Sequence, residues 1–132
     1  MALSILIADD QAKVRFALRV LLESRPDATI VGEVDDAYEL IKQLPELSPS
    51  VIILDWLLPG LSEIGSIESI REQCPEIAVI ALSGRPELGK EALFNGADAF
   101  ISKIDPPDRL QEALDKITNG HSRSELRDET AS

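Results

Sequence analysis

The sequence predicts an α/β fold, in which a doubly wound sheet of five parallel strands carries helices on both faces. Short apolar runs alternate five times with segments whose apolar residues recur every three or four positions, and this alternation is typical of repeated βαβ units. The apolar runs consist almost wholly of Ile, Leu and Val, as is typical of strands buried on both faces of a parallel sheet.

The five strands are expected over residues 3–8, 29–34, 51–55, 77–82 and 99–102. The helix after the first strand, over about residues 11–25, has an apolar face made of Val14, Ala17, Leu18, Leu21 and Leu22. Asp35 or Asp36 can cap the next helix, and Pro45 discourages its continuation because proline donates no backbone hydrogen bond.

Three more helices are expected in the second half of the chain. Ser62 is the predicted cap of a helix that runs to about Gln73. The segment 85–95 should form only a short or irregular helix, because Pro86 and Gly89 interrupt it. Asn95-Gly96 then supplies a left-handed turn, and a last amphipathic helix is expected over residues 108–118.

The 132 residues fit one domain, which we expect over residues 1–120, followed by a polar tail or linker stub over 121–132. The formal charge of −11, from 24 acidic and 13 basic residues, argues against direct nucleic-acid binding, which relies on clustered Lys and Arg. Because no apolar run approaches the ~18 residues of a membrane span and no secretory leader is recognisable, we expect a cytoplasmic protein without membrane contact. Cys74 is expected to be a packed thiol.

Three carboxylates stand at the ends of two predicted strands. Asp9 and Asp10 follow the first strand, and Asp55 closes the third. In a doubly wound sheet of order 2-1-3-4-5 these two strands are neighbours, so their carboxyl ends share one crevice. Three converging carboxylates repel one another unless a cation, a proton or coupled titration relieves them. Mg²⁺ is suitable because it prefers oxygen ligands.

A hydroxyl and an ammonium group are expected at the same edge, because Ser83 follows the fourth strand and Lys103 the fifth. A carboxylate can attack an activated phosphoryl group when a metal and a lysine neutralise the equatorial oxygens, and the product is an acyl phosphate. Asp55 is then the candidate nucleophile. Taken singly, these residues have plainer interpretations: Asp9-Asp10 could cap a helix, Ser83 could be a strand-end hydroxyl, and Lys103 could be a solvated charge.

Five motifs, in order along residues 3–119, resemble the receiver domains of two-component response regulators. The motifs are Ala8-Asp9-Asp10, Leu54-Asp55-Trp56-Leu57-Leu58-Pro59-Gly60, Ala81-Leu82-Ser83-Gly84, Gly96-Ala97-Asp98-Ala99-Phe100 and Ile101-Ser102-Lys103. The resemblance implies the flavodoxin-like receiver fold, with sheet order 2-1-3-4-5. Lys103-Ile104-Asp105 and Ile30-Val31-Gly32-Glu33 are similar to the subfamily whose output domain is a helix-turn-helix.

The resemblance implies a Mg²⁺ site at the three acids, in which Mn²⁺ can substitute. Asp10 and Asp55 would bind the ion directly, and Asp9 would contact it through water. The main-chain carbonyl of Leu57 would be a further ligand.

The resemblance also implies that Asp55 accepts a phosphoryl group, with which Lys103 pairs. Ser83 and Phe100 match the switch positions. Ser83 would be drawn towards the phosphoryl group, and Phe100 would turn into the vacated space, which changes a remote face. Leu57 and Arg85 would flank the path of water to the acyl phosphate, and we expect them to slow its hydrolysis.

The partners implied by the resemblance are a histidine kinase or phosphotransfer protein as the donor, and a downstream protein or an effector domain of the same chain as the output. A weak homodimer would form on phosphorylation. No enzyme activity is expected beyond phosphoryl transfer to the protein itself and self-dephosphorylation.

Other functions remain open at this stage. A flavodoxin-type electron carrier shares the strand order, but Asp9-Asp10 would repel a flavin phosphate. An aspartyl phosphatase or phosphotransferase would need a second acid two residues after Asp55, where the chain has Leu57. A phosphorylation-independent interaction module and the N-terminal receiver piece of a DNA-binding regulator are the closer alternatives.

Overall fold

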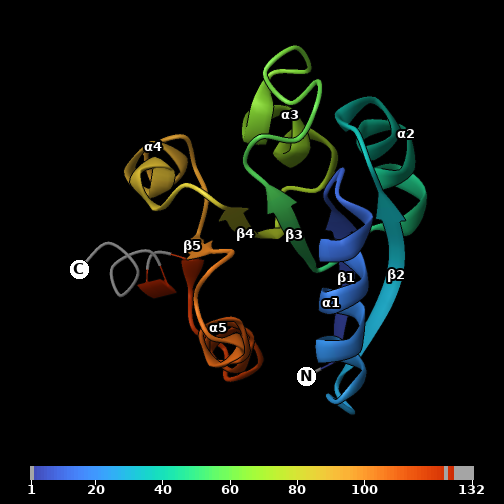
Figure 1. The fold of residues 1–132 in the computed structure, drawn as a ribbon. Coiled ribbons are helices and arrows are strands. Elements are labelled where there is room, and N and C mark those ends of the chain that lie inside the picture. Colours follow the sequence, from blue (N-terminus) through green and yellow to red (C-terminus); the bar gives the residue numbers. More distant parts are fainter. Residues whose placement is uncertain (1, 124, 127–132) are drawn as a thin grey trace.

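The computed structural model describes residues 2–123, 125 and 126, and it contains the predicted sheet (Figure 1). Five parallel strands lie in the order β2-β1-β3-β4-β5. Their bounds are β1 Leu3–Ala8, β2 Ala28–Val34, β3 Val51–Asp55, β4 Ala78–Ser83 and β5 Ala99–Ser102. The predicted fold class and sheet order are therefore confirmed, and each strand lies within one residue of its expected position.

Helices cover both faces of the sheet (Figure 1). They are α1 Ala12–Glu23, α2 Ala37–Leu47, α3 Ser66–Gln73, α4 Gly89–Phe94 and α5 Pro107–Thr118, with a 3-10 turn, η1 Pro86–Leu88, directly before α4. One half of the core joins the sheet to α1 and α5 through Leu18, Leu22, Leu110 and Leu114. The other half joins it to α2, α3 and α4.

The helix α2 begins as predicted but ends later. Asp36 is its cap, and the carboxylate accepts a hydrogen bond of 2.8 Å from the backbone N–H of Glu39. Pro45 lies inside the helix, so the expectation that it discourages continuation was wrong. Proline in the last turn loses its own N–H bond, and the helix continues to Leu47 and is capped by Ser48, whose φ of 40° is left-handed.

The helix α3 starts later than predicted, since Ser62 is not its cap. Residues 56–65 form a series of turns, and α3 begins only at Ser66. Gly65 and Ser66 have φ values of 97° and 58°, and a right-handed helix cannot extend back through two consecutive left-handed residues, so α3 can start no earlier than Ser66. Gly60 also has a positive φ, and a Cβ there would lie 2.7 Å from the Tyr38 ring.

The helix α4 is short, as predicted, and its C-terminal turn is tied to α3. Gly96 adopts a φ of 111°, and the N–H of Ala97 donates to the carbonyl of Ala92 at 3.0 Å. The Arg71 guanidinium donates to the Gly96 carbonyl and to the Asp98 carboxylate, both at 2.6 Å. These bonds fix the point at which the chain enters β5.

The segment after α5 contains local structure that its polar composition concealed. Residues 124 and 127–132 of the expected tail lie outside the described residues. The Ser122 hydroxyl and the Glu125 carboxylate bond reciprocally to each other's backbone N–H, which is a capping box. Leu126 is 3% exposed and adjoins β5 and α5.

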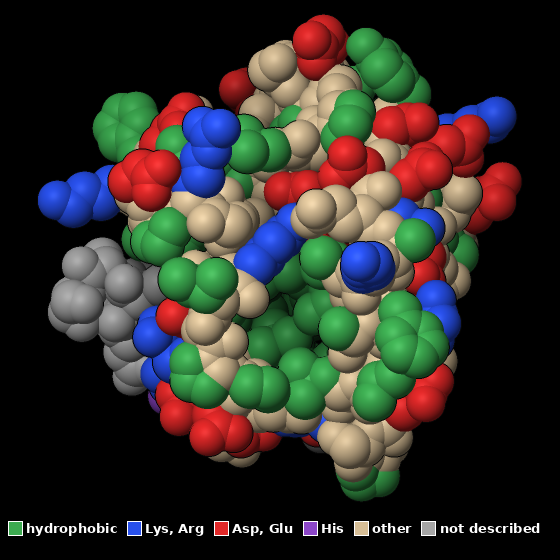
Figure 2. Space-filling view, in the orientation of Figure 1, with side chains coloured by type: hydrophobic (Ala, Val, Ile, Leu, Met, Phe, Trp, Pro, Cys, Tyr) green, Lys and Arg blue, Asp and Glu red, His purple; other side chains and the backbone are tan. Residues whose placement is uncertain are grey.

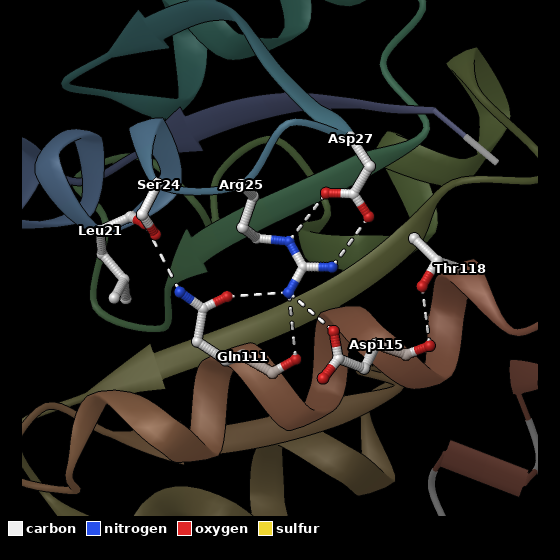
Figure 3. Close-up of polar contacts among 7 residues, drawn as sticks. All are labelled: Leu21, Ser24, Arg25, Asp27, Gln111, Asp115 and Thr118. Atoms are coloured by element: carbon white, nitrogen blue, oxygen red, sulfur yellow. Dashed lines mark hydrogen bonds and ion pairs between the residues drawn. The ribbon is translucent and has the colours of Figure 1, made fainter.

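An open hollow of about 300 Å³ separates α1 from α5, and Figure 2 shows its apolar lining. Two helices do not fully cover this face of a five-stranded sheet. At the far end the two helices are joined by Arg25, whose guanidinium contacts Asp27, Gln111 and Asp115 (Figure 3). The ion pair to Asp115 is 2.8 Å long. None of the described helices combines the length and the apolar character that a membrane span requires.

Candidate functional site

The three acids converge at the carboxyl edge of the sheet. Parallel pairing places Ala8 beside Leu54, so the residues that follow them leave the sheet together. One oxygen from each of Asp9, Asp10 and Asp55 lies within 4.8 Å of the other two. Asp9 and Asp55 are buried, whereas Asp10 is exposed. The cluster therefore consists of two buried carboxylates and one carboxylate that is open to solvent.

Lys103 enters the same cluster from the end of β5. Its backbone N–H donates to the Ser83 carbonyl at 2.8 Å, which extends the pairing of β4 and β5 beyond the last strand residues. The Nζ atom lies 2.9 Å from Asp9 Oδ2 and 3.5 Å from Asp55 Oδ2. A single ammonium group thus forms ion pairs with the two buried carboxylates of the cluster.

The environment of Asp55 disfavours its charged form. Burial raises the pKa of the Asp55 carboxyl above its usual range, and the charges of Asp9 and Asp10 raise it further. The Leu57 N–H, 3.0 Å from Oδ1, and the Lys103 ammonium lower the pKa, but do not cancel the effect of burial. A cation at the site would therefore be bound favourably.

The acids form a set of oxygen donors that fits a hard divalent cation. Asp9 Oδ2 is buried and has no well-aligned hydrogen bond to any described residue, because Lys103 Nζ contacts it only as an ion pair. Such an oxygen retains the capacity to bind a cation or its water shell. The described residues can therefore hold a metal ion.

The two predicted switch residues lie on neighbouring strands, at different distances from the strand ends. Ser83, the last residue of β4, is 1% exposed, and its hydroxyl accepts a hydrogen bond of 3.0 Å from the Arg85 N–H. Phe100, in the middle of β5, is 9% exposed and packs with the α2, α3 and α4 half of the core. Ala81 pairs with Phe100, and Ser83 pairs with Ser102.

Gln11 and Arg15 belong to the site, although their contacts were not predicted from the sequence. The Gln11 side-chain carbonyl accepts a hydrogen bond of 2.8 Å from Lys103 Nζ. The Arg15 guanidinium donates to the backbone carbonyl of Asp9 at 2.7 Å and lies 3.4 Å from Glu33. One feature of the sequence could have drawn attention to Gln11: it stands at the N-cap of a helix, a position where Ser, Thr, Asp or Asn is preferred.

Comparison with known proteins identifies the family of the chain. Residues 5–115 match the model of the response regulator receiver domain family. The transcriptional activator protein ExaE of Pseudomonas putida is 31% identical over 122 residues, which are 91% of this chain and 57% of ExaE. The nitrate/nitrite response regulator NarL of Escherichia coli K12 is 31% identical over 119 residues, 89% of this chain and 55% of NarL.

Solved structures give the same result. The isolated receiver domain of RcsB from Salmonella enterica serovar Typhimurium, with the phosphomimetic BeF3⁻, is 28% identical with a TM-score of 0.82, covering 96% of this chain and 99% of that one. The chain spans little more than half the length of ExaE and NarL. On the match to residues 5–115, the chain belongs to the receiver domain family of response regulators.

Proposed function

We propose that this receiver domain works as a phosphorylation switch in which Asp55 is the phosphoacceptor. The observation that carries the proposal is the convergence of Asp9, Asp10 and Asp55 with the Lys103 ammonium at one sheet edge. A buried carboxylate beside a cation site and a lysine suits attack on phosphorus better than it suits proton transfer.

Mg²⁺ is the proposed cofactor, and Mn²⁺ can substitute. Asp10, Asp55 and the Leu57 carbonyl would hold the ion, with Asp9 acting through a water molecule. When bound, the ion neutralises charge on the phosphoryl oxygens and on the acids.

The reaction proposed is a single displacement at phosphorus. A carboxylate oxygen of Asp55 attacks, the bond from phosphorus to the donor atom breaks, and the donor leaves with that electron pair. Lys103 would move from Asp9 to the transferred phosphoryl oxygens, where it offsets their charge of about −1.5 to −2. The Ser83 hydroxyl, now bound to the Arg85 N–H, would turn to the same oxygens. Hydrolysis of the acyl phosphate by water would reset the site.

The donor we propose is a histidine kinase or a phosphotransfer protein, and the setting is the cytoplasm. The output would be a change in the position of Phe100 that alters a protein-binding face or a homodimer contact. Direct nucleic-acid binding is not proposed for this domain, because its net charge is −11.

The test is incubation of the purified protein with acetyl phosphate and Mg²⁺, followed by intact-protein mass measurement. The expected result is a gain of one phosphoryl group that is absent in Asp55→Ala. No gain in the wild-type protein would favour a phosphorylation-independent interaction module. A gain that survives in Asp55→Ala would place the acceptor elsewhere.

A second proposal concerns the protein to which the domain belongs. ExaE is a transcriptional activator, and RcsB has been solved bound to DNA, while this chain spans only 57% of the one and 70% of the other. We propose that the domain is the N-terminal receiver of a DNA-binding regulator. Sequencing the gene beyond codon 132 tests this, and a stop codon directly after Ser132 would contradict it.

A further inference from the structure

We propose that Gln11 is a positioning residue that holds the Lys103 ammonium beside Asp55 rather than on it. This inference rests on the proposed phosphoryl transfer, and it concerns a side chain that lies outside the set of acids, hydroxyl and lysine. The contact that motivates it is the hydrogen bond of 2.8 Å from Lys103 Nζ to Gln11 Oε1, which joins residues 92 positions apart.

The distances around the ammonium group show where it is held. Nζ lies 2.8 Å from Gln11 Oε1 and 2.9 Å from Asp9 Oδ2, but 3.5 Å from Asp55 Oδ2. The ammonium group therefore lies closer to Gln11 and Asp9 than to the nucleophile, with which it forms only the longest of the three contacts. The ammonium group donates a hydrogen bond to Gln11 Oε1 and contacts Asp9 Oδ2 as an ion pair.

Gln11 and Asp9 are also coupled to each other. The backbone N–H of Gln11 donates to Asp9 Oδ1 at 2.8 Å, while the other oxygen of the same carboxylate contacts Lys103. Asp9, Gln11 and Lys103 thus close a ring that fixes the lysine between the start of α1 and the end of β5. The main-chain part of this ring does not depend on the side chain at position 11.

Within the part of the chain that the structure describes, the Gln11 side chain makes no hydrogen bond besides the one from Lys103. Gln11 occupies the N-cap position of α1, yet its side chain makes no capping hydrogen bond. The first turn of the helix instead uses the Gln11 main-chain carbonyl, which accepts from the N–H groups of Val14 and Arg15. Because the Gln11 side chain does not cap the helix, we infer that its role is to accept the hydrogen bond from Lys103.

Loss of the Gln11 acceptor would change where the lysine rests. With only carboxylates left to accept from it, the ammonium group would close on Asp55 Oδ2. A lysine on that oxygen makes the carboxylate a poorer nucleophile and obstructs the approach of the phosphoryl group. Gln11 is not among the acids that would hold the ion, so the effect would fall mainly on the maximal rate of phosphorylation at saturating Mg²⁺.

Two substitutions separate this function from helix capping. Gln11→Met keeps the length of the side chain but removes the acceptor. Gln11→Asn keeps the amide and is a better N-cap, but it is one methylene too short to reach Lys103. The rate of phosphoryl gain from acetyl phosphate is measured by intact mass over a range of Mg²⁺ concentrations, with thermal unfolding measured for each variant.

We expect the maximal rate of both variants to fall about three- to tenfold, the size expected for the loss of one solvent-exposed hydrogen bond. The Mg²⁺ concentration at half-maximal rate should stay within about twofold of the wild-type value. Gln11→Asn should be at least as stable as the wild type, which separates its slow reaction from a folding defect. A wild-type maximal rate in either variant would overturn the inference, and so would a change confined to Mg²⁺ dependence. A wild-type protein that gains no phosphoryl group would overturn this inference and the proposed function together.

Discussion

Asp55 combines burial with repulsion from two neighbouring acids, and this has a consequence for stability. Its pKa is raised above the ordinary 3.8 mainly by burial. Since the folded protein binds this proton more tightly than the unfolded chain does, stability falls as pH rises from about 4 through the raised pKa. At neutral pH, without a cation, the full penalty of the charged carboxylate is present.

Asp55→Asn should therefore stabilise the metal-free protein at pH 7. The amide removes the charge and keeps the shape, and a gain of about 1 kcal/mol would raise Tm by about 4 °C in a domain of this size. Thermal unfolding in EDTA measures the effect, and the same comparison near pH 3.5 serves as the control. The gain should shrink there, because the wild-type carboxyl is protonated. An unchanged or lower Tm at pH 7 would contradict the argument.

Leu57 presents an apolar side chain, 54% exposed, on the loop directly after Asp55. A water molecule that attacks the acyl phosphate would gain no hydrogen bond from leucine, whereas an amide could bind and orient it. We expect Leu57→Asn to shorten the lifetime of the phosphorylated protein by about tenfold. The decay of the phosphorylated mass after removal of the donor gives the rate. An unchanged decay rate would refute this role for Leu57.

The sequence predicted part of the site because strand pairing dictates it. Asp9, Asp10 and Asp55 close neighbouring strands, so their convergence follows from the sheet order alone. The contact between Gln11 and Lys103 could not be predicted in the same way. It depends on the side-chain conformations of two long residues from opposite ends of the chain, for which periodicity gives no information.

At the scale of the elements, helix boundaries were predicted correctly where a proline or a glycine determines the backbone conformation. Pro86 and Gly89 shorten α4, and Gly96 ends it in a left-handed turn, as expected. The predicted start of α3 was wrong because Ser66 adopts a left-handed conformation, and no sequence pattern predicts that conformation for a serine. Such a conformation is determined by tertiary contacts, here the turns that follow Asp55.

Gly89 couples α4 to the Phe100 ring, and this coupling can be tested. A Cβ at position 89 would lie 2.9 Å from Phe100 Cδ2, closer than van der Waals contact allows. Gly89→Ala gains at most about 1 kcal/mol of helix propensity, since Gly89 is the first residue of α4, but it overpacks a buried aromatic ring, which costs about 1–3 kcal/mol. We expect a net loss of stability and a displaced Phe100, measured by urea unfolding and by the aromatic NMR signals.

Gly84→Ala is the matched control for this prediction, because no described atom lies within 4 Å of a Cβ at that position and its φ is not positive. Its stability should differ little from the wild type. If Gly89→Ala were as stable as Gly84→Ala, with the Phe100 signals unmoved, α4 would not constrain the ring.

At the scale of the whole molecule, an acidic chain places its most crowded acids at one edge of the sheet. The net charge is −11, so any added salt will screen general repulsion, while only a cation held by Asp9, Asp10 and Asp55 will relieve the site itself. Specific binding must therefore be distinguished from screening. The distinction is possible because the two effects depend differently on the identity of the cation.

Mg²⁺ should raise the Tm of the wild-type protein above its value in NaCl of the same ionic strength. A ligand that binds only the folded state at a hundred times its Kd adds about 2.7 kcal/mol, and a gain of even half that is measurable by thermal unfolding. Asp10→Asn removes the exposed acid of the cluster without altering a buried contact, and it should abolish most of the Mg²⁺-specific increase while it retains the response to NaCl. If Mg²⁺ and NaCl stabilised the wild type equally, the acids would act only through general repulsion, and the cation site would have to be abandoned.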